Sequence, residues 1–203
     1  MNFYHDLVTQ KSWQELQNLV KVTKFILIGG WAIYLYTKAL KSKDIDIIID
    51  FHALSALQRH YQIYKNDRLQ KYEAVKDEVQ IDIYLPHFSN LGIPVADLIN
   101  NSRSFAGFTL LEPNYLFILK LYVLKKRGRT PKGRKDFLDL LALIQAKVCN
   151  FDQIDEILHH YHLLELKSTL VTFISENTQI PELKLNSHQY ARLKSELSEL
   201  LKK

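Results

Sequence analysis

The chain of 203 residues is 47% hydrophobic and 24% charged, which is typical of a globular protein with a substantial core and excludes a mainly disordered chain. Its net charge of +5 is mildly basic, and its single cysteine, Cys149, excludes an internal disulfide framework and favours a reducing compartment. Because the sequence contains neither an apolar run of bilayer-spanning length nor a signal-peptide pattern, we expect a cytoplasmic protein that does not enter a membrane.

Helices and strands alternate in the predicted first half. Apolar residues at helical spacing predict a helix over 4–20. The segment KFILIGG (24–30) predicts a short buried strand that ends in two glycines, WAIYLYTKAL (31–40) a helix, and DIDIIID (44–50) a second strand. The elements that follow are a helix over 52–61, two strands around a turn near Lys76 and Asp77 within 68–86, a short helix over 95–101 and a last strand over 104–113.

From residue 114 onward, every long segment has a helical period. The predicted helices cover 114–127, 133–147, 151–160, 162–176 and 188–202. We therefore expect an α+β fold in which a mixed β-sheet with flanking helices, residues 1–112, is followed by an all-helical domain, residues 113–203.

Two acids interrupt the otherwise apolar strand over 44–50. Side chains alternate along a strand, so Asp44 and Asp46 share one face while the neighbouring isoleucines share the other. Aspartate is disfavoured in strands, and two neighbouring carboxylates repel each other unless a cation lies between them. The pair therefore favours a divalent metal ion, and Mg²⁺, which prefers carboxylate oxygens, water and substrate phosphates, suits it.

A third acid has the same phase on a later strand. In EVQIDIYLP (78–86), Asp82 faces away from the apolar side chains. If this strand lies beside 44–50, three carboxylates meet on one sheet face, where they can hold two metal ions for phosphoryl or nucleotidyl transfer. Each aspartate alone is explained as well by a solvated strand face, but the matched phase on two strands favours the catalytic interpretation.

Gly29 and Gly30 separate a predicted strand from a predicted helix. Glycine lets a ligand approach the backbone closely, and the free N–H groups of a helix start attract anions, so a triphosphate would fit here. The pair is neither the dinucleotide-binding fingerprint nor a P-loop, and taken alone it is explained by a turn.

The order of these motifs resembles that of the DNA polymerase β-like nucleotidyltransferase superfamily: IGG, a spacer of thirteen residues, DIDI and a distant IDIY. The resemblance implies that Asp44, Asp46 and Asp82 bind Mg²⁺, that Asp82 also activates the attacking hydroxyl, and that the glycine pair cradles the phosphates of an NTP. It implies as well that Ser42 contacts phosphate, whereas Lys41 stands where relatives often carry arginine.

Two residues of the helical half extend this resemblance. Lys120 lies in the apolar stripe of the helix over 114–127, where it either reaches a phosphate or carboxylate of the site or snorkels to water. Asp136, near the start of the helix over 133–147, also has a structural explanation in the helix dipole. These segments are similar to later motifs of AbiE-type (AbiEii/AbiGii) nucleotidyltransferase toxins. That resemblance implies that Lys120 contacts nucleotide phosphate and that Asp136 belongs to the rim of the active site. We also expect the helical domain to close over the nucleotide, and the resemblance to toxins makes an antitoxin protein a candidate partner.

A basic run, KKRGRTPKGRK from Lys125 to Lys135, holds seven basic residues in eleven positions. Such a run attracts the phosphates of a nucleotide or polynucleotide, although an isolated run is more simply a solvated loop. An RNA acceptor would contact this run through Lys125, Lys126, Arg127, Arg129, Lys132 and Arg134.

Together these patterns predict a Mg²⁺-dependent nucleotidyltransferase that moves an NMP from an NTP to an acceptor hydroxyl, with RNA, such as the 3′ end of tRNA, as acceptor in a toxin-like role. Two alternatives stay open. One is a small-molecule nucleotidyltransferase of the antibiotic-modifying type, whose GGW and Asp-x-Asp elements the chain shares. The other is a non-catalytic module of the same fold that binds nucleotide or nucleic acid.

Overall fold

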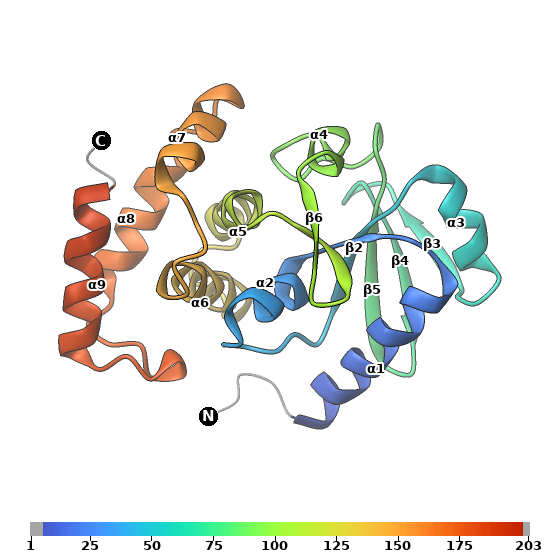
Figure 1. Ribbon diagram of the computed structural model, residues 1–203, viewed down its shortest axis with the longest axis horizontal. Coiled ribbons are helices and arrows are strands. Elements are labelled where there is room, and N and C mark those ends of the chain that lie inside the picture. The colour runs from blue at the N-terminus through green and yellow to red at the C-terminus, as the bar shows by residue number, and fades with distance from the viewer. Residues whose placement is uncertain (1–5, 201–203) are drawn as a thin grey trace.

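The computed structural model places a mixed β-sheet beside a group of helices (Figure 1). It describes residues 6–200, so the ends of the helices predicted over 4–20 and 188–202 lie partly outside the described residues. Within this range, no helix combines the length and the apolar character that crossing a bilayer requires.

The strands within residues 6–200 form one seven-stranded sheet in the order β3-β4-β5-β2-β1-β7-β6. Their bounds are β1 Ile26–Ile28, β2 Ile45–Ile48, β3 Ile63–Asn66, β4 Lys71–Lys76, β5 Val79–Tyr84, β6 Ser102–Phe105 and β7 Phe108–Leu111. The central strand β2 is antiparallel to β1 and parallel to β5, and β1 is parallel to β7. The sheet is therefore mixed, as expected, and the strand with the Asp-x-Asp pair runs beside the strand with the third acid.

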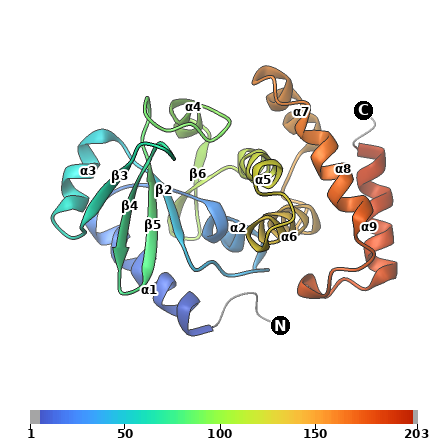
Figure 2. The same cartoon turned by 180° about the vertical axis from the view of Figure 1, so that it is seen from behind.

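The helices extend the molecule away from the sheet. Their bounds are α1 Asp6–Val22, α2 Gly29–Thr37, α3 Phe51–Gln58, α4 Val95–Ile99, α5 Pro113–Arg127, α6 Pro131–Gln145, α7 Phe151–His160, α8 Leu166–Glu176 and α9 Ser187–Leu200, with a short 3₁₀ helix over Pro181–Leu183. Helix α2 lies between the sheet and the pair α5 and α6, and α7, α8 and α9 lie beyond that pair (Figure 1). The view from behind shows the same order (Figure 2).

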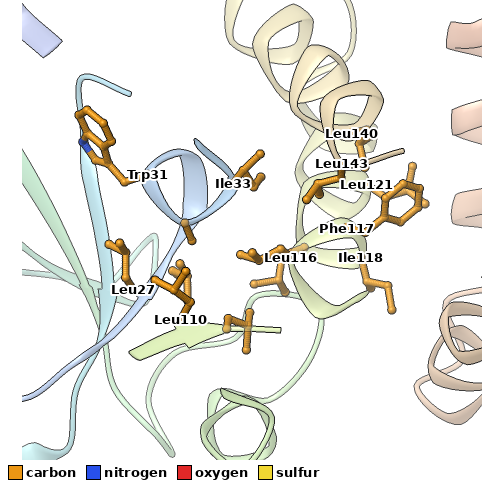
Figure 3. Packing of buried hydrophobic residues seen from close by; sticks show 14 of the residues in the cluster. Leu27, Trp31, Ile33, Leu110, Leu116, Phe117, Ile118, Leu121, Leu140 and Leu143 are labelled. Atoms are coloured by element: carbon orange, nitrogen blue, oxygen red, sulfur yellow. The ribbon is translucent and has the colours of Figure 1, made fainter. Parts of the chain in front are cut away.

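One apolar core joins the sheet to the helices. Leu27 of β1, Trp31 of α2 and Leu116 of α5 are all buried within it, and Figure 3 shows side chains of the sheet, α2, α5 and α6 facing one another. Full burial of such a side chain contributes about 1.5–3 kcal/mol to stability. The predicted domain boundary at residue 112 falls between β7 and α5, and the buried cluster continues across it.

Two capping residues fix helix starts near the acidic strands. The Asp50 carboxylate accepts a hydrogen bond from the Ala53 backbone N–H at 2.8 Å and so begins α3 directly after β2. The Thr130 hydroxyl accepts from the Gly133 backbone N–H at 3.1 Å, and Pro131 occupies the first turn of α6. The sequence therefore ends the central strand and starts α6 at defined points.

Some predicted boundaries are wrong. The single strand predicted over 104–113 is divided, because Ala106 and Gly107, both at positive φ, form a turn between the end of β6 and the whole of β7. Strand β3 was not predicted, and all four of its residues are exposed or half-buried at the sheet edge, so its apolar pattern is weak. The helix predicted over 162–176 begins only at Leu166.

Candidate active site

Asp46 and Asp82 lie side by side on neighbouring strands. The parallel pairing of β2 with β5 places Asp46 opposite Asp82 and buries the isoleucines that alternate with them. Asp44 stands immediately before β2, and all three aspartates line one cavity of about 220 Å³. The predicted pairing of the two acidic strands is therefore confirmed.

The two glycines allow the start of α2 to approach these acids. Gly29 has φ +66°, and a Cβ atom there would lie 2.1 Å from Asp46 Oδ2. A Cβ atom on Gly30 would lie 2.6 Å from the hydroxyl oxygen of Ser42, which donates a hydrogen bond to the Asp44 carbonyl at 3.0 Å. No side chain caps α2, so its first N–H groups are free of a side-chain partner where the glycines line the cavity. The structure thus brings together the glycines, the serine and the acids that the sequence singles out.

Burial and mutual repulsion shape the charge of the acidic pair. Burial, and then the neighbouring Asp82 carboxylate, raise the pKa of Asp46 to about 7. Burial also raises the pKa of Asp44, against the opposing effect of Lys43 and Lys132. Among the described side chains, none forms a hydrogen bond or ion pair with the carboxylate of Asp46 or Asp44. Asp46 therefore lacks a fixed cationic partner.

Asp82, in contrast, has protein partners on both oxygens. Lys71 Nζ lies 2.6 Å from Asp82 Oδ2 and 2.8 Å from Glu73 Oε1, and Gln80 donates a hydrogen bond to Asp82 Oδ1 at 2.8 Å. Lys71 begins β4, is buried and lines the same cavity. Sequence patterns do not single out Lys71; the available signal is a lysine two residues before a glutamate, on a strand predicted to pair with that of Asp82.

The acids do not form a complete metal cage by themselves. Among residues 6–200, no three His, Cys, Asp or Glu side chains are grouped so that they could hold a metal ion. Asp44 and Asp46 offer the hard oxygen atoms that Mg²⁺ prefers, and Mg²⁺ commonly takes only one or two carboxylates together with water and phosphate oxygens. These two residues fit such an ion, and the metal itself stays a prediction.

Lys120 belongs to a buried network of charges on α5 and α6. Its Nζ lies 2.8 Å from Asp136 Oδ1 and 2.9 Å from Asp139 Oδ2, and Lys135 also pairs with Asp139. Arg127 Nη1 contacts Asp136 Oδ2 at 2.7 Å. Burial alone would raise the pKa of Asp139, but the two lysines hold it below its usual value. Lys120 meets carboxylates at the cavity wall, which is one of the two placements expected for it, and Asp136 lines the cavity with it.

Much of the basic run is neutralised by acids outside it. Four of its six proposed RNA contacts form ion pairs: Lys125 with Glu165, Arg127 with Asp136, Arg129 with Glu176, and Arg134 with Glu182. Lys126 Nζ lies over the Tyr122 ring at 4.1 Å, and Lys132 lines the cavity. The run therefore ties α5 and α6 to the C-terminal helices. Lys41 is exposed, with an Asp6 oxygen 4.0 Å away, and is not among the residues that line the cavity.

The fold is similar to that of two solved structures, one of them a candidate nucleotidyltransferase. A candidate nucleotidyltransferase from H. pylori superposes with a TM-score of 0.55 at 15% sequence identity, over 97% of this chain and 94% of that chain. JHP933 from Helicobacter pylori superposes with a TM-score of 0.53 at 14% identity, over 96% of this chain and 92% of that chain. No protein-family model matches the sequence, and a search of curated proteins gives no match. The mixed sheet followed by helices is thus a fold of the nucleotidyltransferase type.

Proposed function

We propose that the chain is a Mg²⁺-dependent nucleotidyltransferase that transfers an NMP from an NTP to an acceptor hydroxyl and releases pyrophosphate. One observation carries the proposal: Asp46 and Asp82 stand side by side in a cavity that the uncapped start of α2 also lines. The similarity of the fold to the candidate nucleotidyltransferase from H. pylori supports the same reaction class.

Asp44 and Asp46 would hold the metal ion. Both line the cavity, and Asp46 has an elevated pKa because it is buried beside a second carboxylate, so a divalent cation there would relieve its repulsion. When bound, Mg²⁺ supplies positive charge that neutralises phosphate oxygens. Ser42 donates a hydrogen bond to the Asp44 carbonyl and so fixes the backbone just before β2.

Other residues of the cavity would position the substrates. Gly29 and Gly30 stand at the uncapped start of α2 and line the cavity, where the positive end of the helix would stabilise phosphate. Lys120 and Lys132 line the cavity and bring positive charge to the triphosphate, while Asp136 orients Lys120. Asp82 would accept a hydrogen bond from the acceptor hydroxyl and take up its proton. Positioning and charge neutralisation account for most of the catalysis in this class of reaction.

RNA is the acceptor class that the sequence favours, with the 3′ end of tRNA as the specific candidate. Of the six proposed RNA contacts, Lys126 and Lys132 are available to bind phosphate, because they have no ion-pair partner among the described acids. The pairing of the other basic residues with acids favours a smaller acceptor as the alternative. A toxin-like role controlled by an antitoxin protein is a further proposal, and it rests on sequence resemblance.

A second candidate function is a non-catalytic nucleotide-binding module. The specific observation in its favour is Lys71, whose ammonium group occupies an oxygen of Asp82 that a catalytic base or metal ligand would need. The presence of Asp44 and Asp46 in the same cavity favours the enzyme. Two carboxylates that repel each other beside a strand are unfavourable, and a module without metal chemistry has no use for them.

Transfer assays distinguish these functions. Each labelled NTP is incubated with the protein, Mg²⁺ and either total tRNA or a mixture of hydroxyl-bearing small molecules, and the Asp44→Ala/Asp46→Ala variant is the matched control. We expect label on one acceptor class with the wild type and none with the variant. Nucleotide binding without any transfer would support the module, and label transfer by the variant would contradict the assigned site.

A further inference from the structure

Lys71 is placed where a metal ion would be expected to neutralise Asp82. The antiparallel pairing of β4 with β5 sets Glu73 opposite Asp82, and the pairing of β5 with β2 sets Asp82 opposite Asp46. Three carboxylates therefore form a row across neighbouring strands. Lys71, two residues before Glu73, is on the same face and inserts its ammonium group between Glu73 and Asp82.

The row is neutralised unevenly. The side chain of Lys71 is only 9% exposed, and two carboxylate oxygens within 2.8 Å keep its ammonium group charged. Both oxygens of Asp82 have partners, Lys71 on one and Gln80 on the other. The carboxylate of Asp46 has neither a hydrogen-bond donor nor an ion-pair partner among the described side chains. One end of the row therefore carries its own cation, and the other end lacks one.

We infer that the ammonium group of Lys71 neutralises Asp82 and so takes the place of a second divalent ion. The chain then binds one divalent ion per nucleotide, at Asp44 and Asp46, rather than the two expected from the sequence. This inference rests on the proposed function, because it presumes a metal-dependent nucleotide site. An ammonium group and a divalent ion repel each other, so the Asp82 carboxylate does not accommodate both.

Counting bound Mn²⁺ tests the inference without relying on activity. The wild-type chain, saturated with a non-hydrolysable NTP analogue, is examined by native mass spectrometry for the number of ions. Electron paramagnetic resonance then reveals any coupling between two ions about 3.5–4 Å apart. We expect one uncoupled Mn²⁺ in the wild type and in Lys71→Arg, which keeps the charge, and two coupled ions in Lys71→Met. Lys76→Met removes another lysine of β4 that pairs with a glutamate outside the cavity, and it should leave one ion.

The outcomes separate this inference from the proposed function. Two coupled ions in the wild type, or one ion in a folded Lys71→Met variant, would overturn the role of Lys71 and leave the nucleotidyltransferase proposal intact. Failure of every variant and of the wild type to bind Mn²⁺ with the analogue would overturn both. If Lys71→Met does not fold, Asp82→Asn decides. The single ion should persist with less than about a twofold change in affinity, and its loss would place the ion on Asp82 and refute the inference.

Discussion

Replacing Asp46 by asparagine should make the metal-free protein more stable. Burial beside Asp82 raises the pKa of Asp46 from an ordinary 3.8 to about 7, so ionisation of this carboxylate opposes folding. A shift of about 3 units corresponds to about 4 kcal/mol at roughly 1.4 kcal/mol per unit, and sharing of the repulsion with Asp82 reduces the expected gain to about 2–4 kcal/mol. Asparagine has nearly the same shape and carries no charge, so it removes this cost.

The sign of the effect gives a pH window. The folded state binds the Asp46 proton more tightly than the unfolded state does. The stability that comes from this proton is therefore fully present below pH 3.8 and is lost as the pH rises towards 7. The advantage of Asp46→Asn should therefore be about 1 kcal/mol or less at pH 4.5 and reach its full value at pH 8. Urea denaturation followed by circular dichroism, with EDTA present, measures both values.

A matched control isolates the effect of burial. Asp77 is exposed in the turn between β4 and β5 at φ 49°, a conformation that asparagine tolerates well, so Asp77→Asn should change stability by less than about 0.5 kcal/mol. An Asp46→Asn variant that is no more stable than the wild type at pH 8 would refute the reasoning about the acidic pair.

Three further predictions concern charge and close contacts. Asp139→Asn leaves two buried lysines short of a carboxylate and should lower the free energy of unfolding by about 3–5 kcal/mol. Asp155→Asn, in a more exposed ion pair, should lower it by less than about 1 kcal/mol. Equal losses of stability in urea denaturation would contradict the burial argument. Gly29→Ala should destabilise the fold by roughly 1–2 kcal/mol because of the positive φ of this residue. The added methyl group also displaces the Asp46 side chain, so Mg²⁺·NTP binding measured by calorimetry should weaken at least about tenfold. Unchanged binding would show that this contact is unimportant. Lys132→Ala should weaken NTP binding severalfold and flatten its dependence on salt, and an unaltered salt dependence in fluorescence titrations would exclude Lys132 from phosphate binding.

The acidic strands could be predicted because their signal is local. Asp46 and Asp82 each interrupt a run of alternating apolar residues, and their matched phase requires no knowledge of distant segments. Lys71 could not be recognised in the same way. Its meaning depends on the register that puts Glu73 opposite Asp82, and a lysine in a short strand usually indicates an exposed edge.

The basic run shows the opposite limitation. Its charge is evident in the sequence, but three of the acids that neutralise it, Glu165, Glu176 and Glu182, lie about forty to fifty residues later, beside α8, on α8 and in the 3₁₀ helix. A charge run therefore predicts a nucleic-acid contact only when its tertiary partners are known. The hairpin β6–β7 was missed for a related reason: its turn contains Ala106 at positive φ, where alanine gives no turn signal.

The central claim is that Asp44 and Asp46 bind a divalent ion together with a nucleotide. Isothermal titration calorimetry with a non-hydrolysable NTP analogue, with and without Mg²⁺, tests it on the wild type and on folded Asp44→Ala/Asp46→Ala. We predict that the wild type binds the analogue only when Mg²⁺ is present and that the double variant loses this Mg²⁺-dependent binding. Equal binding by the two proteins, or wild-type binding that ignores Mg²⁺, would contradict the account.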